Sequence, residues 1–176
     1  MTASAEQITT GLSSLAESQG EDCSLQSHSL AEQLVQQRAL IDNFIALYQQ
    51  LNKDNLHLLG QVYSDDIEFS DPLHQVSGLP ALTDYFANLY QNVASIDFDI
   101  HQVIHQQGAA SLKWTMVFNH SKLNAGADIT VKGVSILAIN NKIYQHQDFF
   151  DLGTMLYEHI PLVGSLVKLV KSKASQ

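Results

Sequence analysis

The spacing of apolar positions divides this chain into segments of different structure. Between residues 30 and 52 large apolar side chains recur three and four positions apart, as in an amphipathic helix. The segments 55–63 and 79–93 show the same period over shorter lengths, and Pro80 stands in the first turn of the latter. The pattern therefore predicts three helices in the first half of the chain.

In the second half the period becomes two, as in strands that bury one face. Four strand candidates follow one another, at 96–106, 109–120, 127–140 and 142–150. Gly108 and the pair Asn140-Asn141 are suited to the hairpin turns between them. A further short strand, IEFSDP, ends at Pro72. Helices followed by a meander predict an α+β fold, with the helices on one face of a curved antiparallel sheet.

The two ends differ from this central domain, which we place at residues 30–152. Residues 1–29 are rich in small and polar side chains and predict a mobile N-terminal arm. Residues 153–176 predict an amphipathic helical extension that Pro161 kinks or splits. Its wide apolar face could pack on the sheet or on a partner subunit, or cover a pocket. Contact with a membrane surface, aided by its three lysines, is the less favoured alternative.

The composition restricts the classes of partner. The chain has 176 residues, enough for one core, and a net charge of −9. Nucleic-acid binding is not expected, because it needs clustered lysine and arginine. The single cysteine, Cys23, cannot form an intrachain disulfide, and no apolar run reaches the length of a membrane span. With no signal peptide at the N-terminus, we expect a cytoplasmic protein.

The last predicted strand carries the clearest candidate chemistry. In KIYQHQDFF the alternation places Tyr144, His146, Asp148 and Phe150 on one face. A histidine beside a carboxylate can be tuned across neutral pH for acid–base catalysis, although a hydrogen-bonded pair could equally serve packing. One face of the strand at 109–120 is predicted to line the core or a pocket, with Leu112, Trp114, Met116 and Phe118.

Metal and cofactor sites are not expected. His101 and His105 are four residues apart along a predicted strand, which is too far to share one metal ion. The sequence also contains no glycine-rich phosphate loop and no nucleophile elbow.

Four stretches of sequence point to a known superfamily. They are YSDDIEFSDP followed by Gly78, LTDYFANLY, GVSILAI and KIYQHQDFFDL, within residues 34–152. Their order resembles the nuclear transport factor 2-like superfamily, and within it the SnoaL-like and ketosteroid-isomerase-like proteins. The resemblance implies a cone-shaped roll, in which a strongly curved antiparallel sheet wraps the helices and leaves an apolar pocket. It also implies a homodimer through the convex sheet face, for which Thr115, Val117 and Asn119 are suited.

The resemblance also implies two alternative bases. In ketosteroid isomerases the aspartate before the matching proline moves a proton between carbons, and Asp71 stands there, although it could instead cap a turn. In SnoaL-like cyclases an aspartate near the position of Asp148 is the general acid and base of a ring closure. The oxyanion donors of the isomerases are a tyrosine and a protonated aspartic acid. The matching positions here hold Leu47, beside Tyr48, and Ser135.

The favoured hypothesis is binding of a small hydrophobic or aromatic molecule. The alternatives are a cofactor-free isomerase or cyclase and a dimeric interaction module. Epoxide hydrolysis of the limonene type is disfavoured, because its Asp–Arg–Asp pocket needs an arginine and the single one, Arg38, lies early in the first helix. The predicted catalytic residues are Asp71, His146 and Asp148. The predicted ligand contacts are Tyr48, Tyr63, His74, Tyr85, Leu112, Trp114, Met116, Phe118, Ser135, Tyr144 and Phe150.

Overall fold

The computed structural model describes residues 29–160 and 162–174 of the chain. The chain divides into two compact units, residues 1–36 and 37–176. Except for its last residue, the predicted arm at 1–29 lies outside the described part, as does Pro161. A long helix, residues 29–50, crosses the boundary between the units. The second unit contains all the candidate chemistry.

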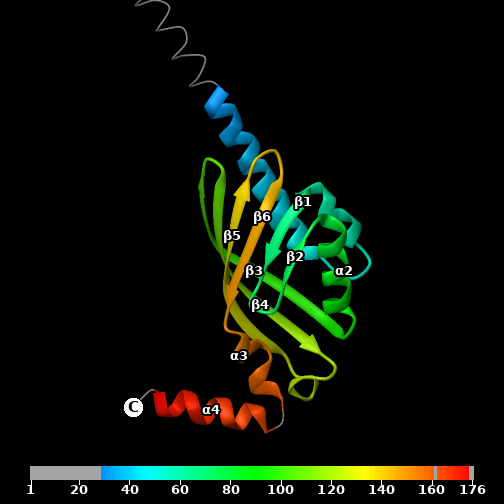
Figure 1. The fold of residues 1–176 in the computed structure, drawn as a ribbon, viewed down its shortest axis with the longest axis vertical. Helices are drawn as coiled ribbons and strands as arrows, with labels where there is room; N and C mark the ends of the chain where they lie inside the picture. Colours follow the sequence, from blue (N-terminus) through cyan, green and yellow to red (C-terminus); the bar gives the residue numbers. More distant parts are fainter. Residues whose placement is uncertain (1–28, 161, 175–176) are drawn as a thin grey trace, which may run out of the picture. The chain divides into compact units, whose positions relative to one another are not determined.

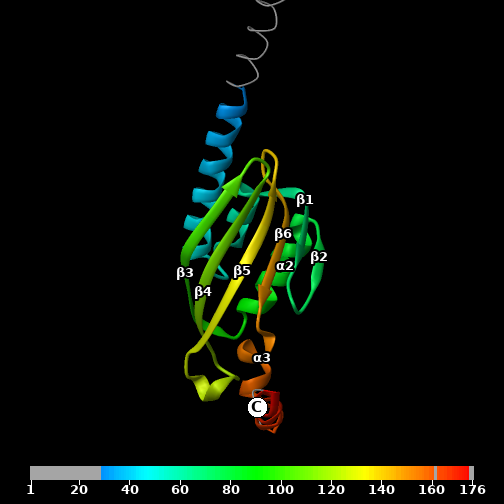
Figure 2. The same cartoon turned by 90° about the vertical axis from the view of Figure 1, so that its left-hand side faces the viewer.

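A six-stranded sheet forms the frame of the second unit (Figures 1 and 2). Its strands are β1 (Tyr63–Ser70), β2 (Gln75–Ser77), β3 (Val93–Gln106), β4 (Ala109–His120), β5 (Ile129–Ile139) and β6 (Ile143–Phe150). They lie in the order β2-β1-β6-β5-β4-β3, so the predicted meander is present. Because β1 runs parallel to β6, the sheet is mixed, and the prediction of a wholly antiparallel sheet is wrong.

The prediction of three N-terminal helices is also wrong. The segment after the long helix forms η1 (Leu56–Gln61), a short 3-10 helix, and α2 (Leu79–Tyr90) follows only after β1 and β2. The long helix ends where Asn52 and Asn55 bond locally: the Asn55 side chain accepts from the Asn52 amide at 2.8 Å and donates to the Gln50 carbonyl at 2.8 Å. Such side-chain bonds compete with the helical pattern and break it.

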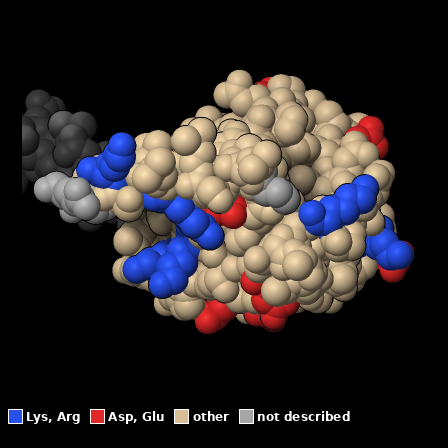
Figure 3. All heavy atoms as spheres, turned by 90° about the horizontal axis from the view of Figure 1, so that it is seen from below, with Lys and Arg blue, Asp and Glu red and all other residues tan. Residues whose placement is uncertain are grey.

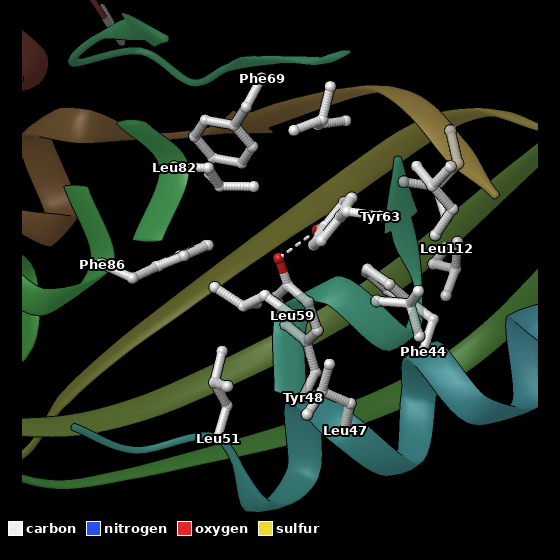
Figure 4. Close-up of a cluster of buried hydrophobic side chains, with 14 of the residues drawn as sticks. Phe44, Leu47, Tyr48, Leu51, Leu59, Tyr63, Phe69, Leu82, Phe86 and Leu112 are labelled. Atoms are coloured by element: carbon white, nitrogen blue, oxygen red, sulfur yellow. Dashed lines mark hydrogen bonds between the residues drawn. The ribbon is translucent and has the colours of Figure 1, made fainter. Parts of the chain in front are cut away.

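The core of the second unit lies between its helices and the sheet (Figure 4). Phe44 and Leu47 come from the long helix, Leu82 and Phe86 from α2, and Leu112 from β4, and all are buried. The three- and four-residue spacing in the helices and the two-residue spacing in the strands direct these side chains to one interior.

The C-terminal segment is helical in three pieces, α3 (Leu152–Met155), η3 (Tyr157–His159) and α4 (Val163–Ala174). Asp151 caps α3 by accepting from the amide of Thr154, and Lys171 of α4 bonds to both Asp151 and Glu158. The opposite face of α4 leaves large apolar side chains exposed, such as Leu166 at 62%. Figure 3 shows basic groups gathered toward the C-terminal half of α4. No helix among the described residues is long and apolar enough to cross a bilayer.

Candidate functional site

A cavity of about 250 Å³ lies inside the second unit, at the end of the sheet where α3 follows β6. Its lining is mainly aromatic and aliphatic: Tyr48, Phe69, Leu73, Phe86, Leu89, Tyr90, Val93, Ile96, Phe98, Trp114, Met116, Phe118, Leu123, Phe150, Met155 and Leu156. The remaining lining residues are Asp71, His120 and Asp148. An apolar cavity with a few convergent polar groups is the usual form of a site for a small molecule.

Gly133 of β5 is a residue that sequence reasoning missed. It faces Trp114 across the β4–β5 pair, and a Cβ at this position would overlap the indole ring. The missing side chain therefore lets the indole lie on β5, where its Nε1–H donates to Ser135 Oγ at 2.9 Å. A glycine in the interior of a strand is the signal that could have indicated such a close approach.

Asp148 is the carboxylate best placed for chemistry. Its side chain is only 16% exposed, and it lines the cavity. Oδ1 accepts two hydrogen bonds, from the Ser135 hydroxyl at 2.5 Å and from His146 Nε2 at 2.9 Å. With both of these bonds on Oδ1, Oδ2 is the oxygen left to meet a ligand in the cavity.

A chain of buried polar groups continues behind Asp148. His146 Nδ1 lies 2.6 Å from the Tyr63 hydroxyl, which lies 2.6 Å from the Tyr48 hydroxyl, the contact drawn dashed in Figure 4. Counting donors and acceptors assigns the directions: Tyr48 donates to Tyr63, Tyr63 donates to Nδ1, and Nε2–H donates to Asp148. In this arrangement His146 is neutral and every proton of the chain has an acceptor.

Burial holds this chain in place. Tyr63 and His146 have no exposed surface, and the His146 ring packs edge-on against Phe69 and Phe44, with centroids 5.0 and 5.6 Å away. Desolvation raises the pKa of Tyr48 and of Tyr63 well above the ordinary value, so both hydroxyls stay protonated. His146 does not line the cavity, and we therefore assign it a positioning role for Asp148.

Asp71 is the second carboxylate of the lining. Its Oδ1 accepts from the amides of Leu73 and His74 at 2.7 and 2.8 Å, and its Oδ2 accepts from the Tyr85 hydroxyl at 2.5 Å. Burial, followed by the contact with Asp71, raises the pKa of Tyr85. Asp71 therefore caps the turn after β1, as one interpretation predicted, and its side chain also lines the cavity.

The structure brings most of the predicted residues together, in three groups. The cavity lining contains Tyr48, Asp71, Trp114, Met116, Phe118, Asp148 and Phe150. Tyr63, Ser135 and His146 bond behind the wall, and Tyr85 and His74 lie around Asp71. Leu112 is a core residue outside the lining. Among the described residues no cluster of three or more potential metal ligands is found.

Tyr144 does not share a face with His146, contrary to the prediction. Its side chain is exposed, whereas Ile143 is buried. The pairing of β5 with β6 is irregular between Ile143 and Gln145, which shifts the alternation by one residue. Such a bulge turns the side chains on its two sides out of phase, and a simple period of two cannot predict it.

Comparison with known proteins identifies the family and the fold. The family model of the SnoaL-like domain matches residues 44–146, more than half of the chain. No curated protein matches the chain. A structure assigned as a SnoaL-like polyketide cyclase from Jannaschia sp. is similar, with a TM-score of 0.60 and 9% identity, over 66% of this chain and 88% of that one.

Two further solved structures share the fold. A protein assigned as a SnoaL-like polyketide cyclase from Shewanella putrefaciens has a TM-score of 0.58 and 18% identity, over 68% of this chain and 93% of its own. A limonene-epoxide-hydrolase-like epoxide hydrolase of M. tuberculosis has a TM-score of 0.57 and 15% identity. The match covers 79% of this chain and 98% of that one. At these identities the similarity establishes the fold alone.

Proposed function

Since the chain belongs to the family of SnoaL-like domains, we propose that it binds a small apolar carbonyl compound and moves a proton on it. Asp148 is the general base in this proposal. The supporting observation is its position, because the carboxylate lies in the wall of a largely apolar cavity with both bonds from neighbouring side chains on Oδ1. Asp71, the alternative base, has protein donors on both of its oxygens.

The proposed step needs no cofactor. Oδ2 of Asp148 takes a proton from the carbon next to the carbonyl group, the C–H bond breaks, and its electrons delocalise as an enolate. The new carboxylic acid then returns the proton to another carbon, which is an isomerisation. In a ring closure the enolate carbon instead bonds to a second carbonyl carbon of the same ligand, the π bond of that carbonyl breaks, and the resulting alkoxide takes the proton from the carboxylic acid. Ser135 and His146 hold the carboxylate, and the apolar lining keeps water from competing for the proton.

Hydrogen exchange into 2-tetralone tests the proposal without the natural substrate. This bicyclic ketone is small and apolar and has acidic hydrogens beside its carbonyl group. In D₂O the protein is expected to speed deuterium incorporation, followed by proton NMR, and Asp148→Asn to slow it by about 100-fold or more. Asp84→Asn, which changes an exposed carboxylate on α2, is the matched control. Exchange no faster than in buffer would exclude proton transfer by this cavity.

Binding is measured separately through Trp114. It is the only tryptophan of the chain and lines the cavity, so a ligand there should change its fluorescence in a saturable way. Saturable binding without exchange would leave the simpler function, that of a binding protein. An unchanged Trp114 signal with 2-tetralone and with a panel of steroid- and polyketide-like compounds would refute both functions, proton transfer and simple binding.

We also propose that two copies pair through the outer face of the sheet. Ile104, Ile136 and Phe149, on β3, β5 and β6, are exposed there, and Ile104 and Ile136 are both paired with Ser111 of β4. A group of exposed apolar side chains on one face of a sheet is typical of a protein interface. Light scattering after size exclusion should report a dimer, and Ile136→Glu a monomer; a wild-type monomer would contradict this proposal.

A further inference from the structure

The cavity combines aromatic rings with two carboxylates, and no lysine or arginine is found among its lining residues. We infer that it takes an apolar ligand carrying a positively charged nitrogen, that is, a hydrophobic amine. The inference rests on the proposed function, since it names the class of molecule that the same cavity holds.

The charge of the lining is the first argument. The bonds found on Asp71 come from a hydroxyl and two amides, and those on Asp148 come from a hydroxyl and a neutral imidazole. His120 accepts from the Lys122 amide through Nδ1, which a neutral ring allows. The lining therefore holds two carboxylates with neutral donors, and burying such charges is costly. A cationic ligand would supply the missing opposite charge.

The aromatic wall is the second argument. Tyr48, Phe98, Trp114 and Phe150 form a continuous row, with successive ring centroids 5.7, 5.7 and 6.1 Å apart. All four rings line the cavity, and Asp148 lies two residues from Phe150 on β6. The negative faces of aromatic rings attract ammonium groups, and a wall of such rings also favours the apolar groups attached to the nitrogen.

The same lining discriminates against other classes of ligand. An acid would place a third negative charge beside Asp71 and Asp148, and the described lining has no lysine or arginine to balance it. A sugar-like ligand would leave most of its hydroxyl groups against aliphatic and aromatic surface. Among ligands of one shape, the expected order of affinity is therefore amine, then neutral molecule, then acid.

Three tetralins of matched shape test this order by isothermal titration calorimetry at pH 7: 2-aminotetralin, 2-tetralol and tetralin-2-carboxylate. The amine should bind about tenfold tighter than the alcohol or better, and the acid more weakly than the alcohol. Asp71→Asn and Asp148→Asn should each lower the ratio of amine to alcohol affinity toward one, with the affinity for the alcohol nearly unchanged. Asp84→Asn, on the exposed face of α2, should keep the wild-type ratio.

The outcomes separate the two proposals. If the alcohol binds as tightly as the amine, or if the Asp71→Asn and Asp148→Asn proteins keep the full preference, the inference is wrong while the apolar binding site stands. If none of the three tetralins binds and 2-tetralone undergoes no accelerated exchange, the proposed function fails, and the inference fails with it.

Discussion

Removal of one hydroxyl group should show whether the buried polar chain stabilises the fold. Tyr63 has no exposed surface, and its hydroxyl lies 2.6 Å from both the Tyr48 hydroxyl and His146 Nδ1. Tyr63→Phe therefore leaves a buried donor and a buried acceptor without partners. Each such group costs about 1–3 kcal/mol, so we expect the free energy of unfolding to fall by about 3 kcal/mol. For a protein of this size that lowers Tm by about 6–12 °C.

Urea unfolding followed by circular dichroism measures this change. Tyr144→Phe is the control, because Tyr144 is 39% exposed and its change should stay within about 0.5 kcal/mol. Adding Tyr48→Phe to Tyr63→Phe should cost less than the sum of the two single changes, since the first change has already left the Tyr48 donor without its acceptor. Nitrogen NMR should find the proton of His146 on Nε2. A Tyr63→Phe protein as stable as Tyr144→Phe would refute the assigned chain.

Three further predictions concern packing and charge. Gly133→Ala should destabilise the protein by about 2 kcal/mol and shift Trp114 fluorescence, because the new Cβ overlaps the indole. Gly60→Ala is the control. Its new Cβ first meets a side chain at 3.4 Å, so its stability should change little. In Gly164→Ala the new Cβ would overlap the Glu158 carbonyl group, so α4 should move away from it and trypsin should cleave α4 faster. An unchanged cleavage rate would contradict the close approach of Gly164 to Glu158. The bond from Lys171 lowers the pKa of Asp151 to about 2, below its ordinary 3.8, so its stabilisation of the C-terminal segment is present above pH 4 and is lost as the pH falls from 4 to 2. Proteolysis by pepsin across this range should show the loss, and Lys171→Met should weaken the pH dependence, leaving the part due to the bonds from Thr154.

Much of the fold was predictable because its signals are local. Alternation of apolar residues placed Trp114, Met116 and Phe118 on one face of β4, and Gly108 marked the turn between β3 and β4. The same alternation pointed to Asp148, the resemblance to SnoaL-like proteins added Asp71, and both carboxylates line the cavity. These predictions need only the neighbours of each residue in the chain, or motifs of a few residues.

Other features depended on contacts between distant segments. Tyr63 and His146 are 83 residues apart and meet because β1 pairs in parallel with β6, a pairing that neither strand's own pattern indicates. The bulge in β6, where its pairing with β5 is irregular, moved Tyr144 outward.

The sequence by itself thus determined which side chains face inward in most elements, because helix and strand periods are properties of the backbone. Only the tertiary structure decided which inward groups bond to one another and where space remains for a ligand. Hydrogen-bond partners and cavities depend on the fit between elements to within fractions of an ångström, and no periodicity along the chain encodes that fit.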